Sequence, residues 1–169
     1  MSKILLETIN LSKTYKHVNG NINLFNNLNL KIKQGDLVAL VGPSGSGKSS
    51  LLHLLALLDE PTKGDIKLNN VLTRKFADEK KDETRRKNIS IIFQDDNLLN
   101  DFTAIENVMM PSIIKGENMK NAKNKAKTIL KKIKILNRAQ HFPKELSGGE
   151  QQRVAIARAI IAETNIILA

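Results

Sequence analysis

Two glycine-rich segments of this chain contain residues whose types and spacing could do chemistry. Residues 42–49 read GPSGSGKS, and residues 146–153, much later in the chain, read LSGGEQQR. Glycines let consecutive backbone N–H groups turn toward an anion, and a helix beginning at such a turn adds partial positive charge. Both segments therefore indicate sites for negatively charged groups, of which phosphate is the usual one in proteins.

The first segment fits the phosphate-loop pattern, in which a glycine-rich turn ends in Gly-Lys-Ser. It follows an apolar run at residues 37–41, predicted to be a buried strand, and opens a second run at residues 48–58, predicted to be a helix. In this pattern Lys48 reaches the β- and γ-phosphates and the Ser49 hydroxyl ligates Mg²⁺. The candidate nucleotide-binding residues are Gly42, Pro43, Ser44, Gly45, Ser46, Gly47, Lys48, Ser49 and Ser50.

The second segment has both a structural and a functional interpretation. Ser147 and Glu150 form the pattern of a capping box, which would start a helix. Gly148 and Gly149 would then lie in the first turn, where each costs up to about 1 kcal/mol relative to alanine. Close approach of an anion to the backbone does explain two glycines there. Because one phosphate loop is already present, the second site predicts a nucleotide shared between two copies of the chain.

Together the two segments resemble the ATP-binding cassette (ABC) family, and the similarity extends from about Leu5 to Ala169. The resemblance implies ATP and Mg²⁺ as cofactors, ATPase activity of the translocase type, and integral membrane permease subunits as partners. It also implies a head-to-tail dimer, in which each ATP lies between the phosphate loop of one copy and the LSGGEQQR segment of the other. Ser147, Gly148 and Gly149 would then contact the γ-phosphate across the dimer.

Two further positions match the family. Tyr15, in the segment LSKTYK, stands where the family places an aromatic ring that stacks on adenine; a half-buried strand tyrosine is the alternative. Gln94 directly follows the apolar run 89–93 and resembles the glutamine that senses Mg²⁺ and the γ-phosphate and couples the site to the membrane subunit. Lys48 and Gln94 are thus the candidate catalytic residues, and Ser49 and Gln94 the candidate metal ligands.

Members of the family use an Asp and a Glu for hydrolysis. Residues 59–62 read DEPT and mimic the family's acidic motif, but they precede the LSGGEQQR segment and are typical of a turn. In the family an Asp and then a Glu follow the strand that corresponds here to residues 165–168. The chain therefore resembles a cassette truncated before these residues, expected to bind ATP without turning it over efficiently. A non-hydrolysing nucleotide-binding fragment is the alternative.

Within the family, KSSLLHLLALLDEPTKG and NLLNDFTAIENVMMP are most similar to the ATP-binding subunits of bacterial lipoprotein-releasing systems. This similarity predicts ATP-driven release of lipoproteins at the cytoplasmic face of the inner membrane, with macrolide-export and cell-division cassettes as alternatives. Asn100, Asp95 and Asp96 depart from the pattern expected there. A soluble cassette acting on ribosomes or chromosomes is disfavoured, because there is no long heptad insertion and no second phosphate loop.

Composition limits the other classes. The chain has 169 residues, which suits one domain, and no cysteine, which excludes disulfides and thiolate metal sites. Its net charge of +10 would favour nucleic acid, but the charge is mostly lysine and aromatic content is 4%, so no nucleic-acid partner is expected. The longest apolar stretch, 51–58, is far shorter than the roughly 20 residues needed to span a bilayer, so no direct membrane insertion is expected.

The predicted elements form an α/β fold of the P-loop NTPase type. It has a parallel core sheet, an antiparallel β subdomain and a helical subdomain at about residues 95–146, all within a single domain 1–169 that is incomplete at its C-terminus. Strands are predicted over 4–10, 24–32, 37–41, 66–68, 89–93 and 165–168.

Two further helices are predicted. A capping box at Thr103 and Glu106 starts a helix over about 104–110, disturbed near Pro111. An amphipathic helix over 119–136 carries lysines on its polar face. That pattern favours packing on the domain with a hydrated lysine side, and a membrane surface or anionic partner is the alternative.

Overall fold

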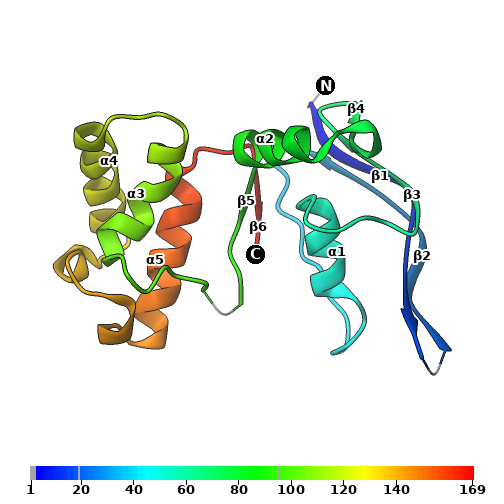
Figure 1. Ribbon diagram of the computed structural model, residues 1–169, viewed down its shortest axis with the longest axis horizontal. Coiled ribbons are helices and arrows are strands. Elements are labelled where there is room, and N and C mark those ends of the chain that lie inside the picture. Colours follow the sequence, from blue (N-terminus) through cyan, green and yellow to red (C-terminus); the bar gives the residue numbers. More distant parts are fainter. Residues whose placement is uncertain (1–2, 19, 95) are drawn as a thin grey trace. The chain divides into compact units, whose positions relative to one another are not determined.

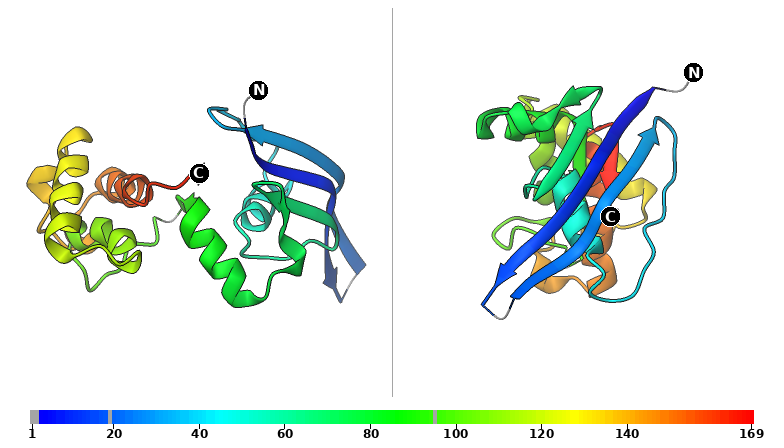
Figure 2. Two further views of the ribbon diagram at one scale, coloured as in Figure 1. Left: turned by 90° about the horizontal axis from the view of Figure 1, so that it is seen from above. Right: turned by 90° about the vertical axis from the view of Figure 1, so that its right-hand side faces the viewer.

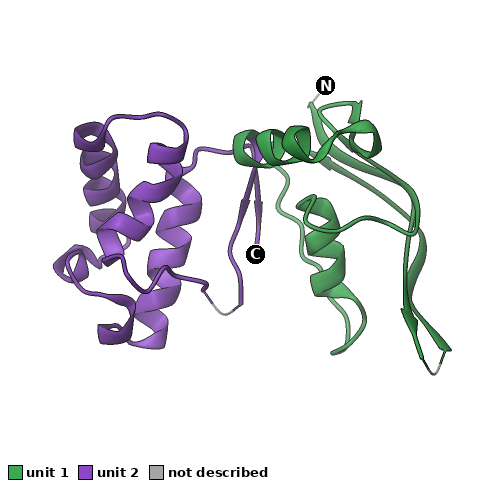
Figure 3. Cartoon of the chain, viewed as in Figure 1, with its two compact units in different colours: residues 1–87 green, residues 88–169 purple. Residues whose placement is uncertain are grey.

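The computed structural model describes residues 3–18, 20–94 and 96–169. Asp95, one of the departures noted above, lies outside these residues. The chain divides into two compact units, Met1–Lys87 and Asn88–Ala169, coloured separately in Figure 3. The phosphate-loop segment belongs to the first unit, and Gln94 and the LSGGEQQR segment belong to the second.

The first unit is built on a long β-hairpin (Figure 1). Its sheet has the strand order β2-β1-β3-β4, and every neighbouring pair is antiparallel. Figure 2 shows β1 and β2 running side by side, with α1 beside the sheet. The elements are β1 (Ile4–His17), β2 (Gly20–Lys33), α1 (Lys48–Leu55), β3 (Lys63–Leu68), β4 (Val71–Leu72), the 3₁₀ helix η1 (Thr73–Lys75) and α2 (Asp78–Asn88).

The unequal burial of β1 and β2 fits the antiparallel sheet. Leu6 and Leu11 of β1 are fully buried, whereas most residues of β2 are exposed. This pattern is expected of strands with one face on a core and one in water. The prediction of early antiparallel, half-exposed strands is confirmed, with β1 and β2 both longer than the sequence indicated.

The strand predicted over residues 37–41 is wrong, because the structure forms no strand there. Leu37 and Val41 are almost fully exposed, and Val38 and Leu40 are about half exposed. A strand forms only where a neighbouring strand takes its N–H and C=O groups, and none of the described strands pairs with this segment. The apolar composition of residues 37–41 predicted a buried strand, but it gives no information on which strand would pair with them.

Helix α2 was not predicted, because it has no apolar periodicity and no buried residue. Ion pairs one turn apart support it instead. Glu83 pairs with both Lys80 and Lys87, and Arg85 pairs with Asp82. The hydrogen bond from Lys80, followed by that from Lys87, lowers the pKa of Glu83 to about 2. Such pairs support an exposed helix where no core packing does.

The second unit combines a short parallel sheet with a helical bundle. Its remaining elements are β5 (Ile89–Ile91), α3 (Ala104–Ile114), α4 (Met119–Lys132), α5 (Gly148–Ile161), β6 (Ile166–Leu168) and the 3₁₀ helices η2 (Leu136–Arg138) and η3 (Pro143–Glu145). Strands β5 and β6 pair in parallel from Ile89 opposite Ile166, and the Ile92 N–H extends the pairing to the Leu168 carbonyl at 2.8 Å. The predicted parallel pairing is present, in shorter strands.

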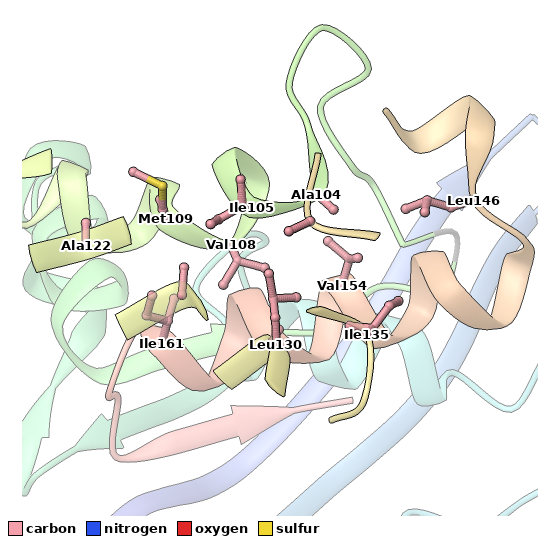
Figure 4. Packing of buried hydrophobic residues seen from close by; sticks show 13 residues of the cluster. Ala104, Ile105, Val108, Met109, Ala122, Leu130, Ile135, Leu146, Val154 and Ile161 are labelled. Carbon is pink, nitrogen blue, oxygen red and sulfur yellow. The ribbon is translucent and has the colours of Figure 1, made fainter. Parts of the chain in front are cut away.

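The core of this unit lies among α3, α4 and α5 (Figure 4). Val108, Leu130 and Val154, one from each helix, are fully buried. Full burial of such a side chain contributes about 2 kcal/mol. The other members of the cluster are Ala104, Ile105, Met109, Ala122, Ala126, Ile135, Ala139, Leu146, Ala157 and Ile161.

The predicted helix starts are correct, but the ends are not: α1 and α4 end earlier than predicted, at Leu55 and Lys132, and α3 ends later. The Glu106 carboxylate accepts hydrogen bonds from the backbone N–H and hydroxyl of Thr103, as the capping box requires. Helix α3 then continues through Pro111 to Ile114 instead of ending near 110. Proline removes one backbone hydrogen bond, but Ser112 and the preceding turn are buried, and this packing outweighs the loss.

Candidate nucleotide-binding site

The phosphate-loop segment forms an exposed turn at the start of α1. Gly45 and Gly47 have φ angles of 79° and 87°, which favour glycine. Gly47 is the N-cap of α1, and no side chain caps the helix. Because the first N–H groups of a helix have no partner within it, those of α1 are available to an anion.

Lys48 lies across this turn. Its ammonium donates to the carbonyls of Gly42 and Pro43 at 2.8 and 2.7 Å. The Ser46 N–H also donates to the Pro43 carbonyl at 3.3 Å, which closes the turn. Pro43, Ser44 and the hydroxyl-bearing Ser49 are exposed, and Ser50 is half-buried. The positive charge is therefore held at the mouth of an uncapped helix start.

The β-hairpin positions the loop. A Cβ built on Gly47 would lie 3.0 Å from the Cβ of Leu24 and 3.4 Å from the ring of Phe25, so the loop packs directly on β2. Phe25 is in turn the register partner of Lys13 on β1. Tyr15 follows two residues later on that strand, so the structure brings the loop and the tyrosine onto one hairpin.

Tyr15 matches the alternative interpretation given to it from the sequence, and its stacking on adenine stays a prediction. It is a strand tyrosine with 41% of its surface exposed, and its hydroxyl donates to the Asp59 carboxylate at 3.0 Å. The Lys13 ammonium lies 4.7 Å from the ring centroid, a cation–π distance. One face of the ring therefore already carries a cation.

The DEPT segment is a turn between α1 and β3, as predicted. Burial alone would raise the pKa of Asp59, but hydrogen bonds from Lys13, the Glu60 N–H and Tyr15 together lower it below its ordinary value. The Glu60 carboxylate pairs with Lys81 at 2.6 Å. Both carboxylates of the segment are thus engaged in structural ion pairs.

The LSGGEQQR segment begins α5 and is capped by its own side chains. The Glu150 carboxylate accepts from the Ser147 N–H at 2.9 Å, and the Ser147 hydroxyl accepts from the Glu150 N–H at a longer 3.4 Å. The Arg138 guanidinium donates to the same carboxylate at 3.0 Å. The backbone hydrogen bond, followed by that from Arg138, lowers the pKa of Glu150 below its ordinary value.

Gly148 and Gly149 are not required by the packing of the chain itself. Both are exposed, and a Cβ added at either would meet no atom within 4 Å. Neither carries a left-handed φ angle. The first-turn N–H groups of α5 are therefore not covered by side chains, and their contact with a phosphate stays a prediction.

Gln94 is an exposed turn residue shortly after β5. The backbone that follows it is tied to α5 by Arg158, whose guanidinium donates to the carbonyls of Asp96 and Asn97 at 2.7 Å each. Burial lowers the pKa of Arg158, while the charge of Asp96 opposes this effect. Arg158 thus links the Gln94 turn to the helix that carries the LSGGEQQR segment.

Asn107 holds the next part of the same loop. Its side chain is completely buried, and its carbonyl oxygen accepts from the Leu99 N–H at 2.8 Å. Its amide donates to the carbonyls of Leu99, Phe102 and Thr103 at 3.0 to 3.1 Å. Asn107 and Arg158 were not predicted from the sequence. Each is a polar residue within an apolar helical run, and this pattern could have indicated a buried polar side chain that makes hydrogen bonds.

No group of three or more His, Asp or Glu side chains suited to a metal ion occurs among the residues that the structure describes. This does not argue against Mg²⁺ at a nucleotide, because Mg²⁺ is usually held by one or two protein ligands together with phosphate oxygens and water. The Ser49 hydroxyl and the Gln94 amide oxygen are suitable ligands of that kind. Their assignment stays a prediction.

The turn over α1, with its glycines and Lys48, defines a phosphate-binding loop of the nucleotide-binding type. The chain belongs to the ABC transporter family, whose model matches residues 25–169. The predicted α/β fold of the P-loop NTPase type is confirmed by solved ABC cassettes. The cassette MJ0796, solved as a dimer in a post-hydrolysis state bound to ADP and Pi, has a TM-score of 0.91 and 40% identity, covering 96% of this chain and 72% of its own.

Among curated proteins, the chain is similar to lipoprotein-releasing system ATP-binding proteins LolD. The protein of Rickettsia bellii (strain RML369-C) is 46% identical over 170 residues, and that of Legionella pneumophila (strain Lens) is 41% identical over 169. Each match covers 100% of this chain and 74% of the relative. Among the described residues, no helix is both long enough and apolar enough to cross a membrane.

Proposed function

We propose that this chain is the ATP-binding subunit of an ABC transporter that uses ATP to release lipoproteins from the inner membrane. It works at the cytoplasmic face of that membrane through integral membrane permease subunits. The proposal rests on the presence of two different helix starts in one chain. The start of α1 has no capping side chain and carries Lys48, whereas the start of α5 has a capping box but leaves its backbone exposed at two glycines. The names of the curated relatives favour lipoprotein release over macrolide export or cell division.

The phosphate loop of one copy holds the nucleotide. Its backbone N–H groups and the start of α1 receive the phosphates, and Lys48 exchanges the Gly42 and Pro43 carbonyls for phosphate oxygens. The Ser49 hydroxyl would ligate Mg²⁺, which would neutralise charge on the phosphates. Adenine stacks on the face of Tyr15 opposite Lys13, because the Lys13 ammonium already occupies the other face.

The second copy completes the site. Its Gly148 and Gly149 N–H groups, together with the Ser147 hydroxyl, approach the γ-phosphate, and the absence of side chains allows that approach. Gln94 contributes to Mg²⁺ binding and senses the γ-phosphate. Its loop is connected to α5 by the hydrogen bonds of Arg158. Two identical sites in a head-to-tail dimer follow.

The Asp59 and Glu60 carboxylates play no part in activating water, because Lys13 and Lys81 bind them. Glu60→Gln therefore leaves nucleotide turnover in the assembled transporter unchanged. A large loss of turnover in this variant would assign the hydrolytic base to the DEPT turn and contradict the proposal.

The composite site is tested by mixing two variants whose defects lie on opposite sides of it. Lys48→Ala removes the phosphate-loop charge, and Gly149→Glu places a carboxylate against the incoming phosphate. A Glu there is favourable to the helix itself, and the space around Gly149 is open, so folding is retained. Asn121→Glu, in the first turn of α4, is the matched control for an added helix-start carboxylate.

Sedimentation velocity with Mg²⁺ and ATP, alongside binding of a fluorescent ATP analogue, reports the result. Lys48→Ala binds nucleotide about 30-fold more weakly and fails to dimerise. Gly149→Glu keeps nucleotide binding but also fails to dimerise, and an equimolar mixture regains dimers with one intact site. Asn121→Glu dimerises like the unmodified chain. ATP-dependent dimerisation of Gly149→Glu alone would overturn the shared site. Release of a lipoprotein from proteoliposomes that contain the membrane subunits tests the cargo.

A further inference from the structure

One face of α4 carries an uncompensated row of positive charge. The four of its lysines within the helix are spaced three and four residues apart, which places them on the same side of α4. All five are exposed, and no ion pair to any of them occurs within the described part of the chain. We name this row the lysine face; it consists of Lys120, Lys123, Lys127, Lys131 and, just past the helix, Lys134.

Acidic neighbours of the lysine face are scarce. Helix α4 contains no Asp or Glu. Lys123 lies within electrostatic reach of the Glu106 carboxylate, which compensates part of its charge. Glu117 and Glu163 pair instead with Lys125, which lies on another side of α4. Like charges one turn apart repel each other, so the face destabilises its own helix unless an anion outside the chain compensates it.

Lysine-rich composition alone does not explain this face, because most of the basic residues of α2 in the same chain are paired with carboxylates. Helix α2 is equally exposed and also rich in lysine, yet it carries acidic residues that pair with its bases one turn away. Lys81 even pairs with two carboxylates, those of Glu60 and Asp78. Charge is therefore neutralised on one exposed helix and left unneutralised on the other.

The lysine face has a fixed orientation. Ala122, Ala126 and Leu130 lie on an adjoining side of α4 and are completely buried in the core of the unit. The Asn118 side chain caps the helix by accepting from the Asn121 N–H at 2.9 Å. The helix cannot roll to hide its lysines without exposing that apolar side, so the face is presented permanently to whatever surrounds the protein.

We propose that the lysine face adsorbs onto the anionic phospholipid headgroups of the membrane. The proposal rests on the proposed function for the presence of a membrane beside the protein. Lysine is a compact, strongly hydrated charge suited to a diffuse anionic surface, and α4 contains neither arginine nor an aromatic ring for nucleic-acid recognition. Ile114 and Met119, 55% and 66% exposed, flank the start of α4 and supply apolar contact at the interface.

The experiment compares vesicle binding by two triple variants of equal charge. Lys120→Gln, Lys127→Gln and Lys131→Gln together remove part of the lysine face. The control removes three exposed lysines of the first unit, Lys3, Lys33 and Lys75. Both variants lower the formal net charge of +10 by three. Binding is measured by co-sedimentation with vesicles of equal parts phosphatidylglycerol and phosphatidylcholine, and with vesicles of phosphatidylcholine alone.

The face variant is expected to bind the anionic vesicles about 100-fold more weakly, since each lysine near an anionic surface contributes about tenfold or less. The control stays within a few-fold of the unmodified chain, and replacing the same face lysines by arginine keeps binding. Neutral vesicles bind neither protein. Circular dichroism melting verifies that every variant is folded.

If the face variant and the control lost the same amount of binding to anionic vesicles, net charge alone would explain the binding, and the proposal would be overturned. Preferential binding of an oligonucleotide over the anionic vesicles, lost in the face variant, would assign the face to nucleic acid and overturn it as well. The assay contains neither ATP nor a membrane subunit. Its failure would leave the nucleotide-dependent dimer untouched, and failure of the dimer would leave vesicle binding untouched.

Discussion

The starts of α1 and α5 are both candidate phosphate sites, yet the chain builds them in opposite ways. The start of α1 has no capping side chain, and Lys48 rests on carbonyls of its own loop. The start of α5 is held by a capping box and by Arg138, with only the glycine N–H groups left open. In the proposed dimer the first site would be completed by its ligand, whereas the second is already held by hydrogen bonds within the chain.

The difference matches the part that each site plays in the proposed dimer. A loop that must surround a nucleotide has to let its backbone rearrange around the phosphates, and an uncapped helix start leaves those N–H groups free to do so. A surface that must recognise a nucleotide already held by another copy gains affinity from being rigid, because less ordering is needed on binding. Internal hydrogen bonds supply that rigidity in the second unit.

The largest expected effect comes from Asn107, which organises the loop of the preformed half. Asn107→Ala leaves the Leu99 N–H and several loop carbonyls without their buried partner, and we expect unfolding free energy to fall by about 3 kcal/mol. Urea denaturation followed by circular dichroism measures the loss. Asn124→Ala, an exposed asparagine on α4, is the matched control and should change stability by about 0.5 kcal/mol or less.

Equal costs for the two asparagines would show that the loop after Gln94 gains no stability from its buried clamp. Hydrogen exchange at residues 99–103 gives the independent reading. In Asn107→Ala these amides should exchange faster, while those of the hairpin in the first unit keep their rates.

The next effect concerns the ligand-completed half. Lys48→Ala removes a charged donor to phosphate, and we expect ATP binding to weaken by about 2 kcal/mol, or about 30-fold in Kd. Stability should hardly change, because the Lys48 ammonium bonds only to exposed loop carbonyls. Titration calorimetry with ATP and a thermal melt separate the two quantities. Lys33→Ala, also exposed, is the control and should leave both unchanged.

A melting temperature that falls in Lys48→Ala as far as its affinity does would contradict the comparison. The lysine would then be part of the folded scaffold of the first unit. Saturating ATP should raise the melting temperature of the unmodified chain and leave that of Lys48→Ala nearly constant, since only binding to the folded state stabilises it.

The sequence predicted the helix starts well, because local rules decide them, whereas the two phosphate sites that it indicates stay predictions. Gly-Lys-Ser after an apolar run and the Ser147–Glu150 capping box depend on neighbours a few residues away, and both helices begin where expected. The residues missed are those whose role depends on distant partners. Arg158 reaches the carbonyls of Asp96 and Asn97 across some sixty positions, which no local pattern shows.

Strand prediction failed for the same reason at residues 37–41. Their apolar run resembles β5 and β6, but a strand also needs a partner of suitable register, and pairing is a long-range property. Helix α2 is the opposite case, an element that forms although it was not predicted. Its stability comes from charge pairs such as Glu83 with Lys87, a pattern that apolar periodicity does not detect.

A smaller effect is expected when Arg158 is replaced by lysine. Lysine keeps the charge but lacks the planar fork that reaches two carbonyls at once, so we expect a loss of about 1 kcal/mol in unfolding free energy. Hydrogen exchange should rise at Asn97 and the following loop. Arg153→Lys, on an exposed position of the same helix, is the control and should have no measurable effect. Unchanged exchange in Arg158→Lys would mean that the loop is held by Asn107 alone.

The smallest effect is the pH response of the α5 capping box. The pKa of Glu150 is lowered by the Ser147 N–H and by Arg138, so the folded pKa lies below the unfolded one. The carboxylate therefore stabilises the helix start fully above its unfolded pKa of about 4.3, and the contribution is lost as the pH falls through the folded value. The α1 start has no carboxylate cap and should show no matching response.

Amide NMR shifts of Gly148 and Gly149, followed from neutral pH to pH 3, measure this response against those of Gly45 and Gly47. We expect the α5 glycines to shift with the titration of Glu150 while the α1 glycines stay constant. Glu150→Gln keeps an acceptor for the Ser147 N–H but removes the titrating group, so its α5 glycines should no longer respond. If the α5 glycines of this variant still shifted as in the unmodified chain, the preorganisation of that half-site would not depend on the Glu150 charge, and the contrast between the two helix starts would rest on the glycines alone.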